Sequence, residues 1–398
     1  MFHYRILVCI ISIVVLGMRG HVPAARAVVA SGDGQPEFRL TVGGEVKVAD
    51  LWAWDAALAD DDTVVMVGST PGPEEAALDK LGPCGAIVDL KAKRSTPFTN
   101  GHTAGIRCVS VSNGRVATTS SFQDPVLRIW DLKAAKTVQE ITIDNPGPDS
   151  QDYYYATWFH KTDRLAVSVP DRLLVFDPAR PDDRTEFKLP DGGEASLHKP
   201  AVSVDDSQIA SAGLVWPNGS NCPVDRSGLV CWDVATRKAT YLSLIPENAP
   251  DKEHWYACDT FFHPTGELFA WRYCPEIPRK ATLDEVPADR RSVVRVDLRE
   301  RKVTPLGFEP NELAHCAMDP SGKWLATVGP SRVVVPRPDS TTVLSELRVY
   351  HLPSKMMVFR EQFDSARPAN WVTFSPSGKR LYVNHGGGTV KWWNVEVK

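Results

Sequence analysis

The feature that most restricts how this chain can fold is a short strand ending that recurs seven times. Each copy places an apolar or aromatic residue directly before Asp, His or Asn. Successive copies are 42, 46, 56, 64, 54 and 43 residues apart, and repeats of about 40 to 50 residues are typical of chains that form one small antiparallel sheet per repeat. The copies are Val88-Asp89, Trp130-Asp131, Phe176-Asp177, Trp232-Asp233, Val296-Asp297, Tyr350-His351 and Trp393-Asn394.

Turn residues precede these endings and divide each repeat into strands. Pro presets one backbone angle and Gly tolerates a positive φ, so the Pro-x-Gly triplets at 264–266, 320–322 and 376–378 predict tight hairpin turns. Each repeat therefore predicts four antiparallel strands. The last repeat offers only three before Lys398. Because an open sheet edge is a liability, we expect residues 38–42 to supply its fourth strand and to close a ring.

The clearest repeat spans residues 101–132. Its three apolar-alternating runs are separated by an Asn-Gly turn and a Phe-Gln-Asp-Pro loop. A Gly-His pair opens the repeat and a Trp-Asp pair closes it, with 27 residues between them. In these residues the chain resembles the WD-repeat family, whose blades hold a buried hydrogen-bonded set of His, Ser or Thr, Asp and Trp. The resemblance implies an all-β, seven-bladed β-propeller over 38–398, with a structural tetrad of His102, Ser120, Asp124 and Trp130.

This tetrad is chemically self-consistent, because an imidazole can donate to a carboxylate while it accepts from a hydroxyl. A hydroxyl, an imidazole and a carboxylate also make up a catalytic triad. Ser120, however, lacks the strained Gly-x-Ser-x-Gly turn that exposes such a nucleophile. The sequence contains no His-Glu-x-x-His motif and no phosphate-binding Gly loop. We therefore assign no catalytic residue, no metal and no cofactor.

Residues 1–27 have the layout of a secretory signal peptide. An arginine precedes the apolar run 6–18, and Ala-Arg-Ala ends at residue 27. The run would form a helix of about 20 Å, which is short against a hydrocarbon core of roughly 30 Å. We predict a cleaved leader, a linker at 28–37, and a periplasmic or secreted protein with no integral membrane span after cleavage. An uncleaved anchor and an intracellular protein are the alternatives.

Charge and cysteine content constrain the partners and the redox chemistry. Removal of 1–27 takes away three arginines and no acids, so the formal charge falls from −4 to −7. An acidic product of this kind is a poor phosphate binder, which argues against a nucleic-acid partner. In an oxidising compartment, proximity in sequence suggests two disulfides, and small buried thiols packed as hydrophobes are the equal alternative. The pairs are Cys222 with Cys231 and Cys258 with Cys274.

The two faces of the predicted ring are unequal. The second-to-third and fourth-to-first connections of every blade emerge on one side, here the loop face, and the remaining turns emerge on the other, the turn face. Four second-to-third connections are long, at 68–85, 214–228, 274–291 and 329–345, and long loops on a rigid scaffold are where recognition usually resides. Aromatic and Arg side chains dominate binding when they cluster. The candidates on or near this face are Tyr153, Tyr154, Trp216, His254, Trp255, Arg272, Tyr273, Arg279, Arg332, Arg337 and His385.

These observations favour an exported, non-catalytic, monomeric scaffold that binds a protein, a peptide or a surface polymer through the loop face. The main alternative is an extracytoplasmic propeller enzyme, lactonase-like or quinoprotein-like, with its site in the central channel. For that alternative the inner strands offer Asp259 and His315. Several convergent acids and histidines in the channel would favour the enzyme.

Overall fold

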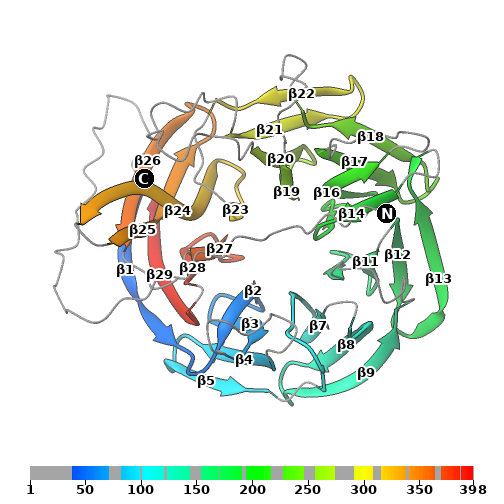
Figure 1. Cartoon of the computed structure of the whole chain (residues 1–398), viewed down its shortest axis with the longest axis horizontal. Coiled ribbons are helices and arrows are strands. Elements are labelled where there is room, and N and C mark those ends of the chain that lie inside the picture. Colours follow the sequence, from blue (N-terminus) through cyan, green and yellow to red (C-terminus); the bar gives the residue numbers. More distant parts are fainter. Residues whose placement is uncertain are drawn as a thin grey trace.

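The computed structural model describes residues 38–70, 82–98, 101–120, 123–143, 154–169, 171–190, 194–216, 227–245, 256–273, 291–307, 315–337, 340–363, 369–385 and 387–397. In this part of the chain, seven antiparallel sheets stand around a central axis and no α-helix occurs (Figure 1). The predicted seven-bladed β-propeller is confirmed. The predicted signal peptide, 1–27, and the linker, 28–37, lie outside the described residues. No helix within the described ranges has the length and apolar character needed to cross a membrane.

Blades 1 to 4 follow one another around the ring, each running from an inner to an outer strand. Blade 4 begins with two short strands that both pair with β16. The strands are β2 Trp52–Leu58, β3 Thr63–Ser69, β4 Pro83–Asp89 and β5 Arg94–Pro97; β6 Cys108–Ser112, β7 Arg115–Thr119, β8 Val126–Asp131 and β9 Lys136–Thr142; β10 Tyr155–Trp158, β11 Leu165–Val169, β12 Arg172–Asp177 and β13 Arg180–Lys188; and β14 Glu194–Leu197, β15 Ala201–Val202, β16 Gln208–Trp216, β17 Ser227–Asp233 and β18 Ala239–Ser243.

Blades 5 to 7 complete the ring, and blade 7 takes its outermost strand from the start of the described chain. Their strands are β19 Tyr256–Phe262, β20 Leu268–Tyr273, β21 Arg291–Asp297 and β22 Lys302–Pro305; β23 His315–Met318, β24 Trp324–Arg337, β25 Ser340–His351 and β26 Met356–Phe363; and β27 Ala369–Phe374, β28 Arg380–His385, β29 Thr389–Val397 and β1 Phe38–Lys47.

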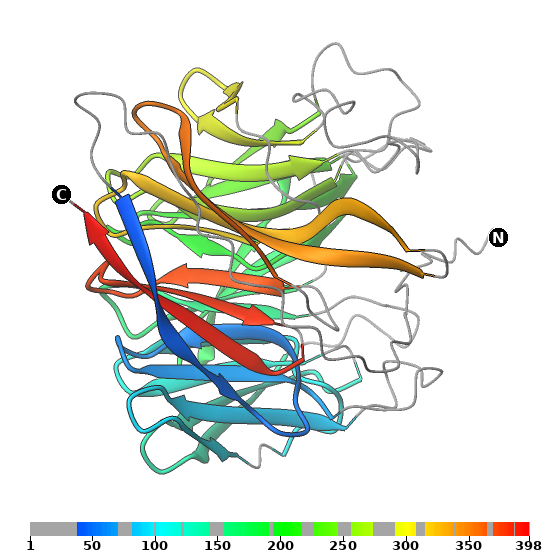
Figure 2. The ribbon, with the colours of Figure 1, turned by 90° about the vertical axis from the view of Figure 1, so that its left-hand side faces the viewer.

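The closure predicted for residues 38–42 is confirmed and extends further than expected. β1 pairs antiparallel with β29 along its whole length, from Phe38 opposite Val397 to Lys47 opposite Thr389. The blue and red strands lie side by side in both views (Figures 1 and 2). The Phe38 ring packs 4.5 Å from that of Trp324 in the neighbouring blade. The closing strand therefore contributes side-chain packing between blades as well as a ladder of hydrogen bonds.

The recurring strand ending has a local physical cause. The Asp that closes the third strand accepts a hydrogen bond from the backbone N–H three residues later in four blades, at distances of 2.6–2.8 Å. In the same four turns the residue four positions after the Asp has a φ of +51° to +59°. An Asp side chain that bonds its own backbone stabilises such a turn. The four residues are Asp89, Asp131, Asp233 and Asp297.

The turn face carries ties between neighbouring blades. Asp206 accepts hydrogen bonds from the backbone N–H groups of His160, Lys161 and Thr162 in blade 3. In the acidic run 60–62, Asp61 likewise accepts from Ser377 of blade 7 at 3.1 Å. These acids therefore fasten one blade to the next on the turn face.

One predicted loop is wrong. The stretch 329–345 is not a loop, because β24 and β25 continue through it as a two-stranded ribbon that ends with Arg337 opposite Ser340. The ribbon projects beyond the other strands (Figure 2). Its run of valines and threonines favours extended backbone, and Pro336 is tolerated because Pro is admitted on edge strands. The second strands of the other long connections end at Ser69, Trp216 and Tyr273.

Candidate functional site

The central channel combines apolar walls with charged groups. The innermost strands of the blades face it, and a cavity of about 500 Å³ runs down it. Its wall includes apolar residues and the prolines of the first hairpin turns of blades 5, 6 and 7, so the cavity reaches the turn face. These residues are Leu58, Phe262, Pro264, Met318, Pro320, Phe374 and Pro376.

Two aspartates enter the channel region from equivalent positions in blades 1 and 5. In β2 the pairing register shifts between Ala53 and Asp55, and in β19 it shifts between Ala257 and Asp259. A bulge of this kind inserts one residue and turns the following side chain to a different direction. Asp55 and Asp259 each also accept a hydrogen bond from the next residue's backbone N–H. The Ala-x-Asp pattern shared by the two strands therefore places both carboxylates.

Asp55 forms an ion pair with Lys199. The Lys199 Nζ lies 2.8 Å from Asp55 Oδ2, and it donates a second hydrogen bond to the Val109 carbonyl at 2.9 Å. Asp55 Oδ2 also accepts from the Val109 N–H. Burial opposes the charge on Lys199, but the Asp55 carboxylate more than offsets it, so the pKa of Lys199 is raised. Asp55 therefore neutralises the positive charge of Lys199.

Asp259 and His315 form the second charged pair, and the structure brings together the two channel groups predicted from sequence. His315 Nε2 lies 3.5 Å from Asp259 Oδ2, and the two side chains are 29% and 20% exposed. His315 Nδ1 lies 3.1 Å from the Val372 carbonyl. Burial raises the pKa of Asp259, and His315 opposes that shift. This pair borders the cavity directly.

Sequence analysis missed Asp55 and Lys199. The signal for Asp55 was available, because Ala53-Trp54-Asp55 repeats the spacing of Ala257-Cys258-Asp259. Lys199 gave no such signal, because it lies in the short segment between β14 and β15 and its partner is distant in sequence.

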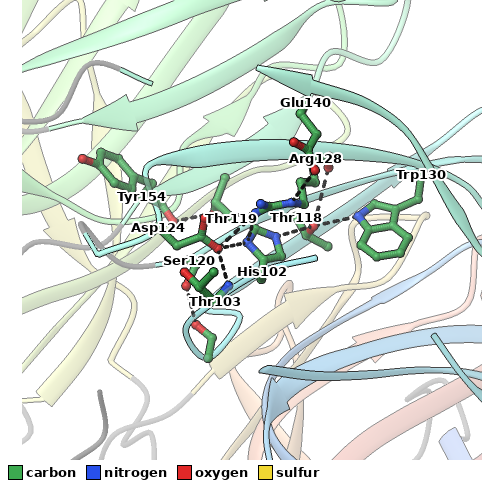
Figure 3. Close-up of polar contacts among 11 residues, drawn as sticks. His102, Thr103, Thr118, Thr119, Ser120, Asp124, Arg128, Trp130, Glu140 and Tyr154 are labelled. Atoms are coloured by element: carbon green, nitrogen blue, oxygen red, sulfur yellow. Dashed lines mark hydrogen bonds and ion pairs between the residues drawn. The ribbon is translucent and has the colours of Figure 1, made fainter. Parts of the chain in front are cut away.

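The tetrad in blade 2 is a structural network with one residue different from the prediction (Figure 3). Trp130 Nε1 donates to Thr118 Oγ1 at 2.8 Å, and that hydroxyl lies 3.0 Å from His102 Nε2. His102 Nδ1 lies 2.5 Å from Asp124 Oδ2. The hydroxyl of the tetrad is therefore Thr118, and the assignment of Ser120 was wrong. Ser120 instead donates to the Gly105 carbonyl at 2.7 Å.

Strand geometry explains why Thr118, and not Ser120, provides the hydroxyl of the tetrad. Residues 118 and 120 point to the same face of a strand, so alternation alone cannot choose between them. The register decides, because Thr118 lies opposite Arg128 and near Trp130, whereas Ser120 comes after the end of β7.

Arg128 adds a fifth member to this network. It donates to both oxygens of Asp124 at 3.0–3.1 Å and to Glu140 at 3.0 Å. Burial lowers the pKa of His102 and opposes the charge of Asp124, whose bonds to His102 and Arg128 nevertheless hold its pKa below the usual value. His102 is 4% exposed, so the set stabilises the blade and offers no open site.

Two of the binding-face candidates are buried. Tyr154 is 1% exposed and packs among the apolar residues between blades 2 and 3. Arg272 is 4% exposed and donates to the Leu244 carbonyl of blade 4 at 2.7 Å. Their assignment to an exposed binding surface was wrong, because their side chains join neighbouring blades.

The remaining candidates are located by backbone or lie outside the described residues. β16, β20 and β28 end at the loop face with Trp216, Tyr273 and His385, and β24 carries Arg332 and Arg337. The side chains of these five are not described. Tyr153, His254, Trp255 and Arg279 lie outside the described residues.

The predicted disulfide between Cys222 and Cys231 is not formed. Cys231 is a free thiol, 3% exposed, within the apolar core between blades 4 and 5. Burial raises the pKa of this thiol to about 12, which keeps it protonated. Cys222 and Cys274, and the side chain of Cys258, lie outside the described residues, so the link between Cys258 and Cys274 stays a prediction.

Comparisons with known proteins agree with the fold. No protein-family model matches the chain. The crystal structure of the Cps50 (Swd1) β-propeller domain of Myceliophteria thermophila superposes with a TM-score of 0.55 at 12% sequence identity, over 90% of this chain and all of that one. Mitochondrial division protein 1 of Neosartorya fischeri is 42% identical over 59 residues, which are 15% of this chain and 8% of that protein. The chain thus spans less than a tenth of that relative, and the structural likeness supports the β-propeller fold.

Among the side chains that the structure describes, no group of three or more His, Cys, Asp or Glu converges as a metal site would require.

Proposed function

We propose that this protein is an exported, non-catalytic propeller of the WD-repeat type that binds a protein, a peptide or a surface polymer through its loop face. The observation that carries the proposal is the projecting ribbon of β24 and β25. β23 pairs with β24 only as far as Val328, and β26 pairs with β25 only from Ser345 onward. In the described structure, the outer edges of the ribbon beyond these points face no further strand.

Free strand edges bind partners through backbone hydrogen bonds. An extended peptide can add to such an edge, and the spacing of its side chains then gives specificity. The turn face differs, because its hairpins are short and are tied to neighbouring blades by groups such as Asp206. A rigid ring whose long connections and projecting ribbon lie on one face is well suited to bind a partner there.

The experiment is a pull-down from the native envelope and from culture medium. In one variant, residues 332–343 are replaced by Asn-Gly, which can close the hairpin because Ser331 already lies opposite Leu344. A second variant shortens 274–291. The control changes the exposed lysines Lys133 and Lys136 of the turn face to alanine.

We expect partners to be lost from the loop-face variants and kept by the control. Unchanged partners in both loop-face variants would refute the assignment of the binding face. Export is tested separately, by fractionation of a C-terminally tagged chain and by sequencing its N-terminus, which should begin after Ala27.

A second candidate function is an extracytoplasmic propeller enzyme, and it is favoured by one observation. Asp259 and His315 lie 3.5 Å apart beside the channel cavity, where a carboxylate and an imidazole could exchange a proton with a bound molecule. Turnover of a lactone or of another small substrate that disappears in Asp259→Asn would support this candidate.

A further inference from the structure

The projecting ribbon of β24 and β25 has two outer edges, and they differ in the backbone groups that they present (Figure 2). In an antiparallel pair, successive residues of a strand direct their N–H and C=O alternately toward the partner strand and away from it. Only the groups directed away can bind a further strand. The contacts at the base and at the tip of the ribbon show which residues these are.

The first proline of the ribbon removes a donor from the edge of β24. At the base, the Trp324 carbonyl accepts a hydrogen bond from the Asp319 N–H at 2.9 Å, so Trp324 directs its backbone groups away from β25. Every second residue after it does the same, and the pairing with β23 ends at Val328. The next residue of this series is Pro330, which has no N–H.

The second proline has the same effect near the tip. Arg337 and Ser340 lie opposite each other with two residues between them, the geometry in which a turn closes on a hydrogen-bonded pair. The pair before it, Pro336 and Thr341, therefore directs its backbone groups outward. Pro336 provides no N–H to the edge of β24, whereas Thr341 provides both an N–H and a C=O to the edge of β25.

The edge of β25 continues a ladder that β26 already uses. Leu347 and Ser345 are outward positions of β25 that pair with β26. The register shift places its extra residues in β24, so the alternation along β25 continues to Val343 and Thr341. No strand of the described structure pairs with these two residues. By Ala369 the chain has turned back, since the Ala369 N–H donates to Ser345 Oγ at 2.8 Å.

The two edges therefore differ in what they can bind. The edge of β24 lacks a donor at both prolines, and proline on an edge discourages pairing with another strand. The edge of β25 presents two N–H and two C=O groups within 340–344, a strand length of about 17 Å. A stable dimer usually buries about 1,200 Å² or more, which so short an edge does not provide. An extended peptide satisfies all of its backbone groups.

We propose that the outer edge of β25, at Thr341 and Val343, binds an extended segment of a partner protein as an added strand. The segment runs antiparallel to β25, in the direction of β26, and continues the blade beyond Phe363. It has no proline where it faces β25, because each of the two outward residues exchanges an N–H···O=C pair with it. The proposal depends on the function proposed for the loop face and assigns the edge through which that face binds.

The test is amide hydrogen exchange, measured by NMR on the full propeller with a blocked hexapeptide of alternating Thr and Val as the probe. In the protein alone, the outward N–H groups of Thr341 and Val343 should exchange faster than the inward ones of Thr342 and Leu344. At ten times its Kd, the hexapeptide should slow exchange at Thr341 and Val343 about tenfold, because only about a tenth of the protein is then unbound. Unchanged exchange at both residues, or no saturable binding, would overturn the proposal.

Paired substitutions separate the backbone groups from the side chains. Proline at both 341 and 343 removes the two outward N–H groups and keeps the inward bonds of the hairpin, as Pro336 does on β24. The matched control is Thr341→Ala with Val343→Ala. The proline variant should bind the hexapeptide about tenfold more weakly than the alanine variant, because two backbone bonds are lost. Equal affinities would show the edge assignment to be wrong. If the proline variant does not keep the ribbon, the exchange experiment on the unmodified protein decides the question.

The same variants distinguish a failure of this proposal from a failure of the loop-face function. Partners that are lost when residues 332–343 are replaced, but kept by the proline variant, would leave the loop face as the binding surface and exclude the edge of β25. Partners kept by both variants and by the variant shortened at 274–291 would refute the loop-face function itself. A concentration-dependent dimer in analytical ultracentrifugation that the proline variant abolishes would make a second copy the occupant and overturn the assignment to a partner peptide.

Discussion

Replacement of Thr118 by valine tests the network that holds blade 2 together. Valine has nearly the same shape but no hydroxyl, so the change leaves the Trp130 N–H without its acceptor at 2.8 Å and His102 Nε2 without its partner at 3.0 Å. Thr118 is fully buried, so water cannot replace either bond. An unsatisfied buried group costs about 1 to 3 kcal/mol, so we expect a loss of about 3 kcal/mol in the free energy of unfolding.

Ser120→Ala is the matched comparison, because Ser120 is the residue that the sequence pattern placed in the tetrad. Its hydroxyl makes one bond to the Gly105 carbonyl, so its removal should cost about 1 kcal/mol. For a ring of this size these losses lower the melting temperature by about 4 °C and about 1 °C. Differential scanning calorimetry at neutral pH measures both. A larger drop for Ser120→Ala than for Thr118→Val would refute the network described here.

Three further predictions follow from the same contacts. Deletion of residues 38–42 removes half of the closing strand and the packing of its apolar side chains, and should lower the melting temperature by about 5 °C or more; an unchanged melting temperature would contradict closure by β1. Cys231 should react with iodoacetamide only after denaturation, and a disulfide-linked peptide containing it in a non-reducing digest would show the burial to be wrong. The pKa of His102 is lowered in the fold, so the stability that His102 contributes is lost as the pH falls below the unfolded pKa near 6.5; the lowered pKa of Asp124 adds a further loss of stability below about pH 4. Calorimetry from pH 8 to pH 3 should show a melting temperature that falls more steeply for the wild type than for His102→Gln. Parallel curves for the two proteins would argue against this linkage.

Several features of the fold could be predicted from the sequence because they are local. In four blades the Asp that ends the third strand bonds to the backbone of the turn that follows, so residues such as Asp131 and Asp233 recur at the spacing of the blades. Counting these endings gave the number of sheets. The absence of a fourth strand before Lys398 required a strand from elsewhere, and 38–42 was the available segment.

The ribbon of blade 6 shows where local reasoning failed. Sequence analysis interpreted 329–345 as a long connection, yet Val335 and Pro336 pair with Thr342 and Thr341 across a hairpin of two strands. Whether such a stretch forms a loop or a ribbon depends on the partner strand opposite, which a single run of residues does not specify.

What the sequence by itself determined is therefore the architecture: seven antiparallel sheets, their order, and a ring closed by a strand from the other end of the chain. Only the tertiary structure decided which polar groups meet. Alternation put Thr118 and Ser120 on the same face, and the register of β7 against β8 chose Thr118. Lys199 reaches Asp55 across 144 positions of sequence, a contact that exists only because the inner strands of separate blades converge on one axis.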